Sequence, residues 1–87
     1  MKERRQIVRH RSLKGGRIVF HDGRSTIDCI VRNLSDKGAA LEVASEMGIP
    51  DLFQLYFADG SAVKECQVIW REETRLGVTF TGSHPQH

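Results

Sequence analysis

Apolar residues alternate with polar or small residues along most of this chain of 87 residues. Successive side chains of an extended strand point to opposite faces, so each alternating run places its apolar members on one face. The apolar members of the successive runs are Ile18 and Phe20; Ile27, Cys29 and Val31; Ala39, Leu41 and Val43; Phe53, Leu55 and Phe57; Cys66, Val68 and Trp70; and Leu76, Val78 and Phe80. The pattern predicts about six half-buried strands and no long helix.

Residues that favour turns separate these runs, at 21–23, 35–38, 47–50, 58–61 and 71–74. Short strands punctuated in this way favour a closed antiparallel barrel, because closure removes exposed strand edges and encloses one small core. We therefore predict an all-β fold, a small six-stranded antiparallel β-barrel over residues 13–82. A flexible basic arm at 1–12 is expected before the barrel, and a disordered polar tail at 83–87 after it.

The length of the chain predicts a single domain with a small core, since a chain of this size buries only about 60% of its unfolded surface. No apolar run approaches the roughly 20 residues of a membrane span, and no secretory apolar stretch follows the charged start. We expect a cytoplasmic protein. Cys29 and Cys66 lack metal-type spacing and are expected to be packed thiols.

The formal net charge of +2 conceals a marked asymmetry. Residues 1–17 carry seven Lys or Arg against one acid, a net of +6, whereas the rest carries six bases and ten acids, a net of −4. An excess of positive charge attracts phosphate-bearing partners, and a solvated flexible arm is the alternative explanation of such a charge run. The N-terminal end is therefore the predicted ligand end.

Two short segments carry the chemical information of the sequence: Arg5-Gln6-Ile7-Val8-Arg9 and Asn33-Leu34-Ser35-Asp36-Lys37-Gly38. Asparagine and serine bond to their own backbone and glycine reaches positive φ without steric cost, so the second segment predicts a turn. A turn needs no cationic partner. An anion-binding cleft would use both the arginines and the turn.

The chain resembles the PilZ domain family as a short single-domain member, because the family signature combines an RxxxR arm with a [DN]xSxxG turn. Here these motifs read RQIVR and NLSDKG. The resemblance covers roughly residues 4–82 and includes the closing pattern Val68-Ile69-Trp70 followed by Leu76-Gly77-Val78-Thr79-Phe80. It implies a PilZ-type barrel.

The resemblance also implies binding of cyclic di-GMP, a bacterial second messenger with two guanines and two phosphodiesters. Arginine suits this ligand, since its planar fork of donors pairs with guanine O6 and N7, stacks on bases and neutralises phosphate. We expect the arm to close over the ligand at the barrel mouth, where an unidentified downstream protein would read the change. The predicted ligand-binding residues are Arg5, Arg9, Asn33, Ser35 and Gly38, with Arg4 as a third cation.

No catalytic or metal site is expected. Ser35 lies outside any G-x-S-x-G elbow, and neither the acids nor the histidines have triad spacing. The four histidines are scattered and form no metal-like cluster with the cysteines. We therefore predict a protein without enzymatic activity and without a cofactor.

Two alternatives remain open. The chain is a PilZ-fold adaptor that has given up the nucleotide, or a small basic barrel that binds RNA or single-stranded DNA. Nucleic acid is disfavoured because only Tyr56, with Trp70 as a second possibility, is available for base stacking. Trp70 itself is expected in the core beside Phe80 in preference to the ligand mouth, since large aromatic residues of small barrels are usually buried.

Overall fold

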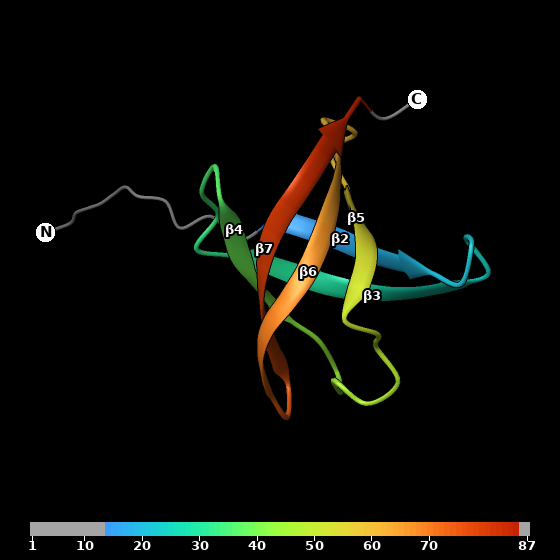
Figure 1. Ribbon diagram of the computed structural model, residues 1–87, viewed down its shortest axis with the longest axis vertical. Coiled ribbons are helices and arrows are strands. Elements are labelled where there is room, and N and C mark those ends of the chain that lie inside the picture. Colours follow the sequence, from blue (N-terminus) through green and yellow to red (C-terminus); the bar gives the residue numbers. More distant parts are fainter. Residues whose placement is uncertain (1–13, 86–87) are drawn as a thin grey trace, which may run out of the picture.

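The computed structural model describes residues 14–85, which form six β-strands and no helix (Figure 1). The strands are β2 (Lys14–Phe20), β3 (Ser25–Arg32), β4 (Gly38–Glu42), β5 (Leu52–Phe57), β6 (Val63–Glu72) and β7 (Arg75–His84). The arm predicted at 1–12 lies outside the described residues.

The strands form one closed antiparallel barrel in the order β2-β3-β4-β7-β6-β5. Residues 54–57 of β5 pair with residues 16–19 of β2 and so close the sheet. The strands of the long β6–β7 ribbon run across the direction of the β2–β3 hairpin (Figure 1). The predicted all-β fold with a six-stranded antiparallel barrel is therefore confirmed.

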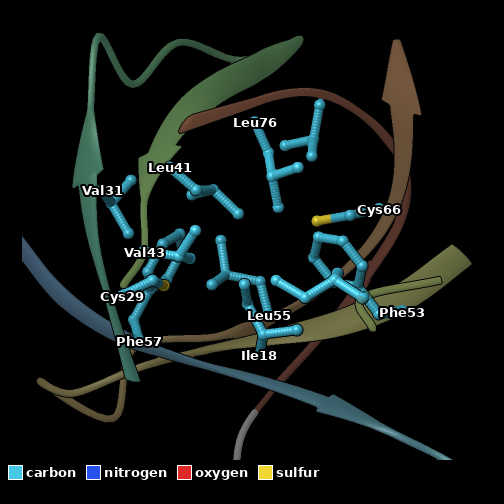
Figure 2. Packing of buried hydrophobic residues seen from close by; sticks show 12 residues of the cluster. Ile18, Cys29, Val31, Leu41, Val43, Phe53, Leu55, Phe57, Cys66 and Leu76 are labelled. Carbon is cyan, nitrogen blue, oxygen red and sulfur yellow. The ribbon is translucent and has the colours of Figure 1, made fainter. Parts of the chain in front are cut away.

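The interior of the barrel receives the apolar side of each strand (Figure 2). In β5, for example, Phe53, Leu55 and Phe57 are buried, whereas the intervening Gln54 and Tyr56 are only half-buried. The largest fully enclosed side chains are Ile18, Leu41, Leu55, Leu76, Val31 and Cys66. The alternation read from the sequence thus predicts the inward face of the strands, with Trp70 as an exception.

Both cysteines are free thiols inside the barrel, with Cys29 6% and Cys66 1% exposed. Burial, reinforced by the nearby Asp28 carboxylate, raises the pKa of Cys29 to about 12. Burial also raises the pKa of Cys66 to about 12. Since the thiolate is the nucleophile and the metal ligand, these thiols are inert at neutral pH. The prediction of packed thiols is confirmed.

The last strand is longer than the sequence pattern indicates. β7 runs to His84, and its residues Ser83 and His84 pair with Lys64 and Val63 of β6. The barrel sheet therefore extends two residues into the segment 83–87 that was predicted to be a tail. Polar composition alone does not reveal this extension, because the pairing comes from the neighbouring strand.

Residues 14–85 contain no helix that is long and apolar enough to cross a membrane.

Candidate functional site

The hexapeptide Asn33–Gly38 links the end of β3 to the first residue of β4, and it is exposed for most of its length. Asn33 has a φ of 53°, in the left-handed region. Asparagine is several-fold enriched there among residues other than glycine. The predicted turn is therefore present, and its first residue has a side chain suited to the backbone conformation.

Ser35 closes this turn through its side chain and its backbone. The hydroxyl accepts hydrogen bonds from the amides of Lys37 at 3.2 Å and Gly38 at 3.3 Å, and it donates to the Gly38 carbonyl at 3.3 Å. The Ser35 amide donates to the same carbonyl at 2.9 Å. The serine of the motif thus holds the turn in one shape before any ligand is considered.

Gly38 allows the turn to lie directly against β7. A Cβ at this position would collide with the carbonyl oxygen of Val78. The adjacent Lys37 carbonyl accepts hydrogen bonds from the Phe80 amide at 2.8 Å and from the Thr79 hydroxyl at 3.2 Å. Only glycine permits this close approach, so the last residue of the motif fixes the turn onto the neighbouring strand.

A hollow of about 340 Å³ lies beside the turn on the outer side of β4, β6 and β7. We call it the turn hollow. Small side chains form its floor and the indole of Trp70 forms part of its wall. Its lining residues are Asn33, Ser35, Lys37, Gly38, Ala39, Ala40, Ile69, Trp70, Gly77, Val78 and Thr79.

Trp70 corrects the expectation that it fills the core. Its side chain is 41% exposed, and its ring lies over Gly77, where an added Cβ would collide with the indole. A β-bulge shifts the register between Val68 and Trp70, so Trp70 pairs with Gly77 on the outer side of the barrel. A glycine inside a strand pattern often marks a close approach, and Gly77 was the sequence signal that was missed.

Charged groups flank the turn hollow. Lys37 is exposed at the rim and supplies a cation from within the turn itself. Beyond Ala40, the Glu42 carboxylate lies 2.7 Å from Arg32 Nε and 3.5 Å from Arg75 Nη2. One carboxylate therefore stands between two guanidinium groups.

The structure brings together three of the predicted ligand-binding residues, Asn33, Ser35 and Gly38, at the turn hollow. The other three, Arg4, Arg5 and Arg9, lie outside the described residues. Lys37 and Trp70 line the same hollow and were not among the residues predicted from the sequence.

The first described residue lies at the end of the barrel that carries the turn. Lys14 pairs with Val31, two residues before Asn33, so the chain enters β2 at the end of the barrel that carries the turn. Arg9 precedes Lys14 by five residues, and extended chain spans at most about 3.6 Å per residue, which limits their Cα separation to about 18 Å. The start of β2 and the turn therefore lie at the same end of the barrel.

No group of three or more His, Cys, Asp or Glu side chains suited to a metal ion is found in the part of the chain that the structure describes.

The described residues form a small closed antiparallel barrel with a turn built on serine and glycine. A family model described as the PilZ domain matches residues 3–87, and the chain belongs to this family. PilZ domains are generally cyclic di-GMP-binding or adaptor modules. Searches among characterised proteins and among solved structures gave no match.

Proposed function

We propose that this PilZ domain is a receptor for cyclic di-GMP, with the dinucleotide bound between the basic arm and the turn hollow. The observation that supports the proposal is the pairing of Lys14 with Val31, which brings the start of β2 to the end of the barrel that carries the turn. The family relationship supports the ligand class. Arg5 and Arg9, with Arg4 as a third cation, are the proposed arm contacts.

The lining of the turn hollow suits a guanine dinucleotide. The exposed indole of Trp70 offers a flat face for stacking a base, an interaction worth about 1–3 kcal/mol per base. Asn33 offers amide donors and an acceptor, while Lys37 adds a cation for phosphate. A bidentate arginine contact to guanine contributes about 1–3 kcal/mol of discrimination, so two such contacts account for guanine specificity.

The function is a switch without chemical transformation. An arm that closes over the ligand changes the surface around the turn, and a partner protein that distinguishes the two surfaces reads the messenger. We place this receptor in the cytoplasm, where nucleotide second messengers act.

Calorimetric titration of the full chain with cyclic di-GMP tests the proposal. We expect the wild type to bind. Arg9→Ala should lose tenfold or more in affinity, because it removes an arginine contact worth about 1–3 kcal/mol and each factor of ten corresponds to about 1.4 kcal/mol. Arg5→Ala is expected to behave similarly. Quenching of Trp70 emission during the titration would report stacking in the turn hollow.

Arg24→Ala is the matched control, because Arg24 is exposed in the connection between β2 and β3, at the opposite end of that hairpin from Lys14. The proposal fails if the wild type produces no heat, which would leave an adaptor without nucleotide. It also fails if Arg24→Ala weakens binding as much as Arg9→Ala. A steep loss of affinity with added salt would favour polymeric nucleic acid, since many phosphate contacts release many counterions.

A further inference from the structure

One edge of β3 is paired along only part of its length. On the β2 side, residues 25–31 all have partners. On the β4 side, the pairing begins at Ile30, which lies opposite Glu42. Within the part of the chain that the structure describes, residues 25–29 therefore have no strand beside them on this side.

The edge is open because the chain that follows β4 leaves β3 for the β6–β7 hairpin. The Val43 amide donates to the Thr74 carbonyl at 3.0 Å, and the Glu46 amide donates to the Glu73 carbonyl at 3.0 Å. A hollow of about 320 Å³ lies in the gap between β3 and residues 42–44. The tip of the β2–β3 hairpin projects beyond the rest of the barrel (Figure 1).

The alternation of exposed and half-buried side chains in β3 begins one residue before the strand, at Arg24. We call residues 24–28 the open edge. Natural edge strands are commonly protected by lysine, proline or a bulge. The open edge contains no lysine or proline, and β2 and β3 pair without a register shift. Alternate residues of a strand direct their N–H and C=O groups to each side, so the open edge is a template for another strand.

The side chains of the open edge are arranged symmetrically about Thr26. Arg24, Thr26 and Asp28 are exposed on the outer face, whereas Ser25 and Ile27 are half-buried on the inner face. Arg24 and Asp28 lie two residues to either side of Thr26 and carry opposite charges. If two such edges pair antiparallel about Thr26, each Arg24 lies opposite the Asp28 of the other copy, and the two Thr26 residues lie opposite each other.

The surrounding charges do not oppose this pairing. Arg17 on β2 lies beside Asp28, with its Nε 3.8 Å from Oδ1. Beyond Asp28, the Glu42 carboxylate is 2.7 Å from Arg32 Nε on the same chain. The charged residues of the outer half of the hairpin, residues 16–29, are Arg17, Asp22, Arg24 and Asp28. Two bases and two acids leave this half of the hairpin without net charge, so the two hairpins are not held apart by like charges.

We propose that the open edge is an interface between two copies of this chain, which pair antiparallel about a two-fold axis at Thr26. Addition of a strand to a free sheet edge is a common mode of recognition. The turn hollow lies at the other end of β3, so it stays open in each copy. The paired segment is short beside the roughly 20–30 residues a side of a standard interface, so we expect a weak dimer that forms at high protein concentration.

Sedimentation equilibrium of the full chain, from about 10 μM to about 1 mM, measures the association. We expect a monomer–dimer equilibrium within this range. Arg24→Asp and Asp28→Arg each place like charges opposite each other, and a two-fold axis does so twice, so each should weaken association roughly tenfold. The chain with both changes restores opposite charges and should return to within about threefold of the wild type. Arg17 lies beside position 28 in the single and double variants alike, so it does not account for this recovery.

Thr26→Cys tests the position of the axis. Residues directly opposite each other in an antiparallel pair have Cα atoms about 4.5 or 5.5 Å apart, a separation that a disulfide spans. We expect this variant to form a cross-linked dimer in oxidised glutathione. Thr74→Cys is the matched control, because Thr74 is also an exposed threonine, but in the β6–β7 turn. The native thiols of Cys29 and Cys66 are buried and do not compete.

The proposal is overturned if the wild type stays monomeric up to about 1 mM, since a dissociation constant above this value corresponds to less than about 4 kcal/mol of binding. It is also overturned if the double charge variant associates no better than the single variants, or if Thr74→Cys cross-links as fast as Thr26→Cys. Arg24, Thr26 and Asp28 are exposed, so the variants should fold, and thermal unfolding verifies this. No nucleotide is present in these measurements, so their outcome is independent of the proposed function.

Discussion

The barrel interior and the turn hollow are built by opposite means. The interior is filled by aliphatic and aromatic side chains such as Leu55, which is fully enclosed. The hollow exists because side chains are missing at Gly38 and Gly77, where a Cβ would strike Val78 or Trp70. Burial of apolar surface stabilises the first region, whereas close approach of backbone and ring shapes the second. Substitutions should therefore act on stability in the interior and on shape at the hollow.

The largest effect is expected from truncating an enclosed side chain. Leu55→Ala should lower the free energy of unfolding by about 2–5 kcal/mol, because it removes buried methyl groups and leaves a cavity. Urea denaturation measures the loss. Leu52→Ala is the control on the same strand, since Leu52 is 65% exposed. Equal losses in the two variants would contradict the distinction between interior and surface.

Alkaline pH should lower the free energy of unfolding through the two buried thiols. The folded thiols of Cys29 and Cys66 have a pKa of about 12, against an ordinary value near 9. Between these values the unfolded chain releases protons that the folded chain retains, so stability is unaffected below about pH 9 and falls as the pH rises from there toward 12. The maximal slope is about 1.4 kcal/mol per pH unit for each thiol.

Denaturation curves measured from about pH 8 to pH 11 check the slope. This range lies roughly between the pKa of an ordinary thiol and that of a buried one. A chain carrying both Cys29→Ala and Cys66→Ala should show a shallower alkaline decline. The same decline in the two proteins would show that other groups, and not the buried thiols, cause the loss.

An added methyl group at the turn should cost less than a cavity in the core. Gly38→Ala forces the turn away from the Val78 carbonyl, and overpacking of this kind costs about 1–3 kcal/mol. Gly15→Ala is a control in β2, because its Cβ would make only an ordinary contact of 3.5 Å with Ala58. Thermal or urea unfolding compares the stability of the two variants. A neutral Gly38→Ala would mean that the turn and β7 separate easily.

The smallest effect is expected from Ser35→Ala. The hydroxyl is exposed, so losing its hydrogen bonds should cost about 0.5–1.5 kcal/mol, while amide exchange of Lys37 and Gly38 should become faster. Ser83→Ala in β7 provides the comparison, since the Ser83 side chain makes no hydrogen bond within residues 14–85. Unchanged exchange at the turn would indicate that Ser35 serves the ligand alone.

The sequence predicted most of the interior but only part of the site. Alternation identified inward residues such as Ile18 and Val78, because strand periodicity and burial are both local properties of the chain. The turn was also predicted, since Asn33 and Gly38 have distinctive backbone preferences. Trp70 was wrongly expected in the core, because a single bulge in β6 reverses the side to which it points.

The sequence by itself determined six strands, their apolar faces and the turn chemistry, since these depend on residues close together along the chain. Only the tertiary structure decided that β5 closes on β2, that Lys14 enters beside Asn33, and that Trp70 covers Gly77. These features depend on the register between paired strands, where a shift of one residue changes every contact. The turn hollow is a product of that register.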